Sequence, residues 1–235
     1  MPKFLFISYI FFFISIQQGF CQGEMQPFPF DWEGIANGEI NNSFLLDKPA
    51  GQKGFIQIQD GHFVKPNGDR FRIWGVNVTG GACFPEKTEA PKVAEFLSHM
   101  GINAVRFHFL DSNWDEEKSI FDASKNNTRE FNHVQLDKLD YFISELKKRG
   151  VYSNFNLNVG RNYRQGDKVP YYELLGLAKG ATIFDHRIIQ LQKEYAAKLL
   201  KHKNAYTGNE YRNEPALAFV EIVNENSLVE AWFSG

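Results

Sequence analysis

The sequence predicts an α/β fold: an incomplete (β/α)8 barrel (a TIM barrel) with about the first four β/α strands, preceded by a β-hairpin. Three observations predict it. Strand and helix patterns alternate along residues 70–223, which favours right-handed crossovers and parallel pairing. The longest connections, 111–132 and 159–184, follow predicted strands, as cleft-forming barrel loops do. Finally, the apolar run 216–223 ends abruptly in Asn-Glu-Asn at 224–226, and polar side chains at a strand tip are typical of a barrel active site.

The first predicted element is the hairpin. Its strands cover residues 54–59 and 62–65, and Asp60-Gly61 between them is a dipeptide that favours tight hairpin turns. A second turn follows, and residues 70–77 are predicted as the first strand of the barrel.

Three helices and three further strands are predicted after it. Apolar residues recur at helical spacing over 88–100, 133–149 and 186–203. The expected N-caps are Thr88, Asn132 and Asp185, and the first two helices are expected to end at Gly101 and Gly150. The strands between and after them are expected at 102–110, 151–157 and 216–223.

Length and charge limit the class of protein. The 235 residues suffice for one sizeable domain with a hydrophobic core. The formal net charge of −2 lacks the basic excess typical of proteins that bind nucleic acid, so we expect no nucleic-acid partner.

The N-terminus predicts secretion. Residues 1–21 are typical of a signal peptide, because Lys3 precedes a short apolar stretch and a cleavage site of acceptable form. That stretch is too short for a comfortable membrane span, so none is expected in the mature chain. A lipid anchor on Cys21 is the less favoured alternative. Residues 22–53 are predicted as an irregular lead-in, and residues 54–235 as the barrel segment.

Polar side chains gather at the predicted strand tips. Arg106 and His108 share one face of the second strand, and Asn158 follows two further asparagines on one face of the third. The fourth strand ends in Asn224-Glu225. Polar groups on buried strands cost free energy unless they are hydrogen-bonded, so their clustering favours an active site.

These residues carry a family resemblance. Over roughly residues 44–235 the chain resembles the retaining glycoside hydrolases of clan A, and most closely the cellulase-like proteins of glycoside hydrolase family 5. The segments that carry the resemblance occur in the family's order: Gly54-Phe55-Ile56, Asp60-Gly61-His62-Phe63-Val64, Arg72-Ile73-Trp74-Gly75-Val76-Asn77, Asn103-Ala104-Val105-Arg106-Phe107-His108, Leu136-Asp137-Lys138-Leu139-Asp140-Tyr141 and Val220-Glu221-Ile222-Val223-Asn224-Glu225-Asn226.

The resemblance implies a role for each site residue. Glu225 would be the general acid/base, and Asn224 would hydrogen-bond the 2-hydroxyl of the sugar. Arg106 would lie beneath the nucleophile, and His108 would line the sugar subsite. Asn158 stands where relatives commonly carry a histidine; it can bond a sugar but cannot titrate. The substrate would be a β-linked polysaccharide or oligosaccharide, cleaved with retention.

A retaining enzyme needs a second carboxylate, which the family takes from the seventh strand. Neither Asp111 nor Glu221 matches that position, and Glu221 is expected to point toward the barrel wall. We therefore expect this sequence to be the N-terminal half of a larger enzyme, and to be inactive by itself.

Two alternatives stay open. One is a non-catalytic carbohydrate-binding or scaffold protein built on a half barrel; the other is a different secreted barrel hydrolase. No cofactor and no metal are expected, because the sequence has neither metal-ligand spacing nor a phosphate-binding glycine loop.

Overall fold

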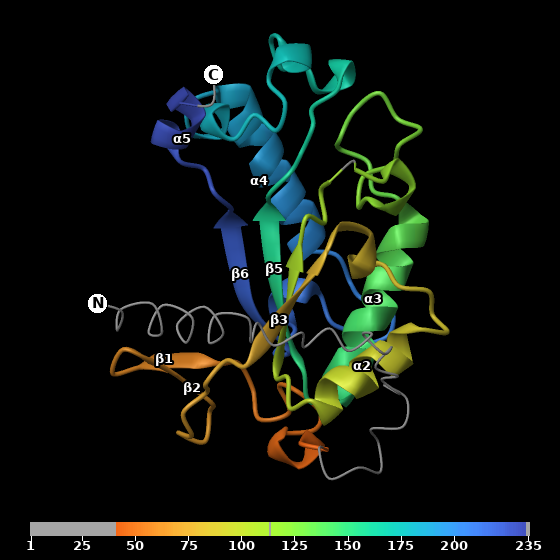
Figure 1. Cartoon of the computed structure of the whole chain (residues 1–235), viewed down its shortest axis with the longest axis vertical. Helices are drawn as coiled ribbons and strands as arrows, with labels where there is room; N and C mark the ends of the chain where they lie inside the picture. Colours follow the sequence, from red (N-terminus) through yellow and green to blue (C-terminus); the bar gives the residue numbers. More distant parts are fainter. Residues whose placement is uncertain (1–40, 113, 234–235) are drawn as a thin grey trace, which may run out of the picture. The chain divides into compact units, whose positions relative to one another are not determined.

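The computed structural model describes residues 41–112 and 114–233, and the predicted signal peptide and the start of the lead-in lie outside them. Two short strands pair as an antiparallel hairpin, and four longer strands form a parallel sheet in sequence order (Figure 1). The elements, in order, are β1 Gln57–Gln59, β2 His62–Val64, β3 Gly75–Thr79, α2 Ala90–His99, β4 Ala104–His108, α3 His133–Lys148, β5 Tyr152–Asn158, α4 His186–Leu200, β6 Leu217–Val223 and α5 Leu228–Phe233.

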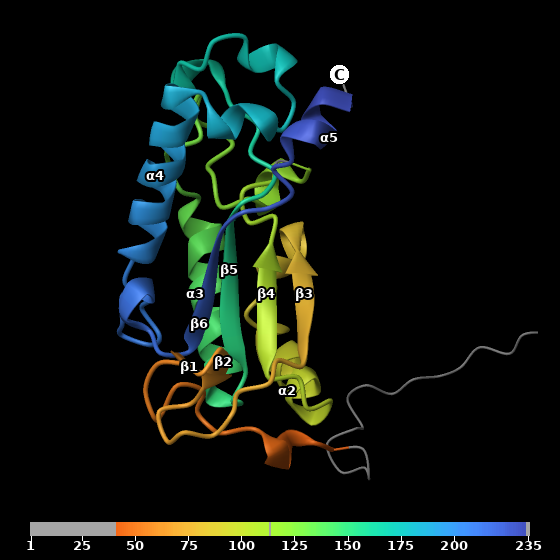
Figure 2. The same cartoon turned by 90° about the vertical axis from the view of Figure 1, so that its left-hand side faces the viewer.

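The predicted α/β class and the parallel sheet are confirmed. Helices α2, α3 and α4 lie on one face of the sheet (Figures 1 and 2), and their apolar side chains bury the outward-facing residues of the strands. Three fully buried aromatic rings form the centre of this layer: Phe107 on β4 meets Phe142 and Phe155 edge to face, each at 5.8 Å between ring centroids.

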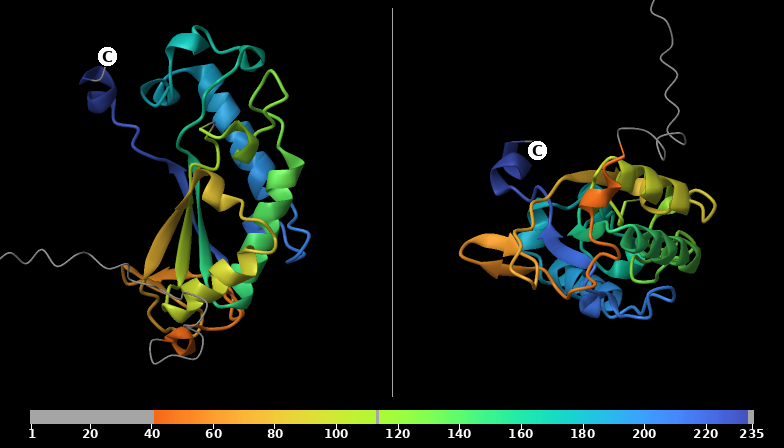
Figure 3. Two further views of the ribbon diagram at one scale, coloured as in Figure 1. Left: turned by 45° about the vertical axis from the view of Figure 1, so that its right-hand side comes forward. Right: turned by 90° about the horizontal axis from the view of Figure 1, so that it is seen from below.

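The opposite face of the sheet holds the polar side chains. All four strands run in one direction, so their carboxyl ends meet at the end where α5 lies, and the hairpin lies at the other end (Figure 3). Phe71, Tyr152 and Ala216 form a second small core at the amino ends of the strands. Because this core and the hairpin cover the amino ends of the strands, the polar side chains at the carboxyl ends are not covered by them.

The local signals for helix ends are mostly confirmed. The side chain of Asn132 accepts from the backbone N–H groups of Val134 and Gln135, and Asp185 accepts from that of Ile188. Gly101 and Gly150 have φ of +73° and +84°, the left-handed conformation that ends a helix and favours glycine. Thr88 is not a cap: it lies in a turn, and α2 begins two residues later.

The first barrel strand begins five residues later than predicted. Residues 70–74 are not part of the sheet, and β3 begins at Gly75. The side chain of Asn103 supplies the reason, because it accepts from the N–H of Trp74 and donates to the carbonyl of Arg72. These bonds satisfy the backbone that a neighbouring strand would otherwise pair.

Candidate active site

An ion pair lies at the centre of the polar face. Arg106 on β4 donates from Nε to Oε1 of Glu221 and from Nη2 to Oε2, both at 2.7 Å. Asn154 and Asn156 on β5 donate to the same carboxylate at 2.6 and 3.2 Å. A bidentate guanidinium–carboxylate pair with added amide donors is a strong and geometrically specific arrangement.

The prediction for Glu221 was therefore wrong: its side chain points to the polar face. The sequence held a signal for this, since strand residues at 219, 221 and 223 share a face. The register then places Glu221 beside Asn156.

Arg106 also connects His108 and Asn224. Its Nη1 lies 3.0 Å from Nδ1 of His108, and its Nη2 donates to Oδ1 of Asn224 at 3.0 Å. The structure thus brings Arg106, His108 and Asn224 together at the carboxyl ends of β4 and β6. Their roles toward a sugar stay predictions.

Glu225 follows directly and is open to solvent. Its side chain is 67% exposed, and its backbone has φ of +54°, a left-handed conformation uncommon outside glycine. Its carboxylate accepts from Nζ of Lys179 at 3.1 Å. Lys179 comes from the long connection between β5 and α4, so spacing along the sequence gave no sign of this contact.

Asn158 shares the polar face with Asn154 and Asn156, but its side chain bonds the backbone of β6 and not the charged side chains of the site. Asn158 is buried, and its side-chain amide donates to the backbone carbonyl of Ile222 at 2.7 Å. The backbone N–H of Asn224 in turn donates to the backbone carbonyl of Asn158. Its side chain therefore helps to hold β6 in register. A contact with a sugar stays a prediction.

The charged groups in this network shift one another's pKa values. Arg106 lowers the pKa of Glu221, chiefly through their hydrogen bonds. Burial, followed by the nearby Arg106 cation, lowers the pKa of His108, which favours a neutral ring. The hydrogen bond from Lys179 lowers the pKa of Glu225.

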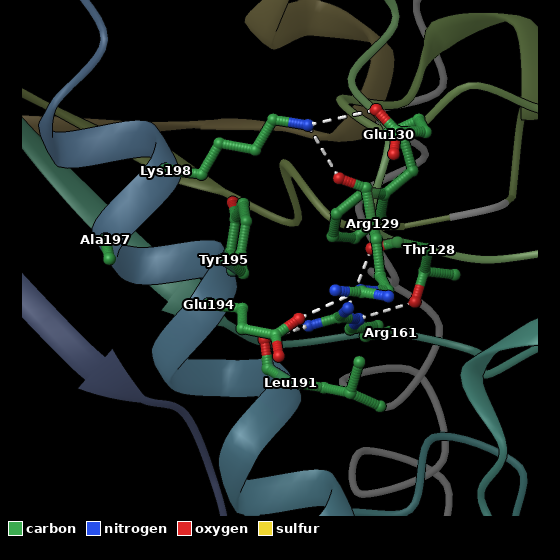
Figure 4. Close-up of a pocket in the computed structure, with 10 residues that line it drawn as sticks. Thr128, Arg129, Glu130, Arg161, Leu191, Glu194, Tyr195, Ala197 and Lys198 are labelled. Atoms are coloured by element: carbon green, nitrogen blue, oxygen red, sulfur yellow. Dashed lines mark hydrogen bonds and ion pairs between the residues drawn. The ribbon is translucent and has the colours of Figure 1, made fainter.

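Asp111 and Arg161 lie outside this network. Asp111 is buried and accepts from the N–H groups of Val159 and Gly160, and burial raises its pKa to about 6. Arg161 is buried between Thr128 and Leu191 beside a pocket of about 490 Å³ (Figure 4). None of the predicted site residues lines that pocket.

If Glu225 is the general acid that the resemblance implies, we predict that Lys179→Met moves the alkaline limb of the pH–rate profile of glycan hydrolysis to higher pH. A general acid must be protonated before it cleaves the bond, and the alkaline limb of kcat/KM reports its pKa. Lys179 lowers the pKa of Glu225, so its removal raises that pKa and keeps the acid protonated to higher pH. Lys193→Met, at an exposed lysine of α4, is the control and should leave the limb in place. An unmoved limb in Lys179→Met would mean that the ion pair does not tune the acid.

Comparison with curated proteins finds two plant enzymes. Mannan endo-1,4-beta-mannosidase 2 of Arabidopsis thaliana is 28% identical over 181 residues, which are 69% of this chain and 40% of that protein. Mannan endo-1,4-beta-mannosidase 5 of the same plant is 30% identical over 141 residues, which are 57% and 31% of the two chains. The chain thus spans less than half the length of these curated relatives. No protein-family model matches it.

Solved structures share the fold. The endo-1,4-beta-mannanase from Rhizomucor miehei has a TM-score of 0.58 at 21% identity, covering 73% of this chain and 48% of that one. A glycoside hydrolase family 5 mannosidase from the same fungus has a TM-score of 0.53 at 15% identity, covering 74% and 49%. The resemblance to family 5 is confirmed. None of the helices in the described part of the chain is long and apolar enough to cross a bilayer.

Proposed function

We propose that this chain forms part of the catalytic domain of a retaining glycoside hydrolase that cleaves β-linked mannan. One observation carries the proposal: Asn224 and Glu225 lie at the carboxyl end of a parallel strand, and Asn224 is tied to Arg106 and, through it, to His108. The names of the plant relatives support mannan as the substrate.

In this mechanism Glu225 protonates the leaving oxygen and then activates water. The second carboxylate must lie about 5–5.5 Å from it and act as the nucleophile. Glu221 is poorly suited, because Arg106 holds both of its oxygens. We therefore place the nucleophile in the part of the relatives that this chain does not span. A nearby second carboxylate would also raise the pKa of Glu225, as an acid role requires.

The edge of the sheet supports a complete (β/α)8 barrel in the whole protein. In the described part of the chain β6 pairs only with β5, and its apolar Val220 and Ile222 are exposed. A further strand and helix would cover them, since exposed apolar edges favour association.

Secretion is part of the proposal and rests on the pattern of residues 1–21 alone. N-terminal sequencing of the protein recovered from the medium of a secreting host would test it. We expect a new N-terminus close to Cys21, and an intact Met1 in the medium would argue against it.

The function is tested on a glycan panel with the protein from its complete reading frame. We expect release of reducing ends from β-1,4-mannan, and little from cellulose or xylan. Binding to mannan without release would favour the carbohydrate-binding alternative, and hydrolysis of a different glycan would favour another barrel hydrolase.

We predict that Trp114→Ala raises KM for long mannan chains by about tenfold. The Trp114 ring is 64% exposed and rests on Phe109, 4.1 Å between centroids, and Phe109 in turn contacts His108. The free face of this ring suits stacking on a sugar ring. A tenfold rise in KM from the loss of this stacking corresponds to about 1.4 kcal/mol of binding free energy. Phe44→Ala is the control, because Phe44 is 77% exposed and lies outside the sheet, before the hairpin. Equal effects of both variants would contradict the subsite.

A further inference from the structure

The chemistry of the guanidinium assigns the donors and acceptors around Arg106. A guanidinium only donates hydrogen bonds, so each atom that it contacts must accept. The atom of Asn224 at 3.0 Å from Nη2 is therefore the amide oxygen, and Nδ1 of His108, at 3.0 Å from Nη1, carries no proton.

A second donor gives the same result for the histidine. The ionised carboxylate of Glu221 only accepts, so the atom of Asn156 that faces it at 3.2 Å is the NH2 group. That NH2 group lies 3.3 Å from Nδ1 of His108. Two donors thus face Nδ1, and a neutral His108 must carry its proton on Nε2.

The same network orients the side-chain amide of Asn224. Its Oδ1 is engaged by Arg106, so its NH2 group points away from the guanidinium, and this amide contributes to the lowered pKa of the neighbouring Glu225. In the described part of the chain, Nδ2 is buried and has no partner within ordinary hydrogen-bond geometry. A buried amide donor without a partner is costly, so a native protein that keeps one usually bonds it to a ligand or water.

We propose that Glu221 is a positioning residue that fixes the hydrogen-bond polarity of this site. By holding Arg106 at two points, Glu221 keeps His108 in the Nε2–H form and keeps the NH2 group of Asn224 turned away from Arg106. Both groups then offer donors to acceptor oxygens of a neutral sugar. The role of the sugar rests on the proposed function; the tautomer and the amide orientation do not.

The tautomer can be measured without substrate. In a long-range proton–nitrogen NMR spectrum of protein with ¹⁵N-labelled histidine, we expect His108 to have an unprotonated Nδ1 and a protonated Nε2. The variant His108→Gln identifies its signals among those of the six histidines. A wild-type spectrum with the proton on Nδ1 would overturn the proposal.

The role of Glu221 is tested by Glu221→Gln, which keeps the shape but removes the charge. We expect His108 to populate both tautomers and kcat/KM on mannan to fall about tenfold to a hundredfold, because misplaced groups lose orientation. The matched control Glu210→Gln breaks an exposed pair with Arg212 and should change neither. An unchanged tautomer in Glu221→Gln would overturn the proposal.

A second variant and a second outcome distinguish a failure of the positioning role from a failure of the proposed function. If Glu221→Gln does not fold, Glu221→Asp keeps the charge but shortens the side chain, so it cannot hold Arg106 at both nitrogens and should likewise mix the tautomers. If the wild-type tautomer is as expected and Glu221→Gln mixes it, the positioning role stands even when no glycan is cleaved. The absence of glycan cleavage would then overturn the proposed function alone.

Discussion

Glu225→Gln is expected to lower kcat on β-1,4-mannan by about 10²–10⁴-fold, the usual contribution of general acid–base catalysis. Glutamine has nearly the same shape, so substrate binding should persist, but it cannot give a proton to the leaving oxygen. The exposure of the Glu225 side chain, 67%, makes a folding defect unexpected. Reducing-sugar release and the melting temperature of the variant are the measurements.

An activated substrate makes this test specific to proton donation. An aryl β-mannoside with a good leaving group needs little protonation, so Glu225→Gln should slow the first step far less on it than on mannan. Glu173→Gln, in the exposed part of the connection before α4, is the matched control and should retain full activity. Equal losses on both substrates would mean that Glu225 is not the acid.

Phe107→Ala is expected to reduce the free energy of unfolding by about 3–5 kcal/mol, the range for removing a buried aromatic ring. Phe107 is fully buried, and its ring meets Phe142 of α3 and Phe155 of β5. The substitution leaves a cavity where the sheet and its helical layer join. Urea unfolding should show a lower midpoint with an unchanged slope.

Phe44→Ala is the control for that prediction. Phe44 is 77% exposed, so its loss should change the free energy of unfolding by less than about 0.5 kcal/mol. If Phe107→Ala cost as little as Phe44→Ala, the core between the sheet and the helices would not be the main source of stability.

Much of this fold could be predicted because its signals are local. The capping asparagine at 132 and the glycines at 101 and 150 act through their own backbone, so the sequence pattern carries the information. The order of the parallel strands follows from alternating periodicity, which needs no knowledge of distant contacts. The resemblance to family 5 rested on such segments.

The site was only partly predictable, because its contacts are not local. The orientation of Glu221 depends on Arg106, which lies 115 residues earlier in the sequence. The pair between Glu225 and Lys179 joins a strand tip to a long connection of irregular structure. The late start of the first barrel strand has a similar cause, since Asn103 satisfies the backbone of residues 72–74 from a distance.

The stereochemistry of hydrolysis tests the central claim most directly. Proton NMR of a β-1,4-mannooligosaccharide, recorded during the first minutes with the protein from its complete reading frame, follows which anomer appears first. Two carboxylates about 5–5.5 Å apart give retention, so the account predicts the β-anomer first, followed by slow mutarotation. Release of the α-anomer first, or no hydrolysis at all, would contradict it.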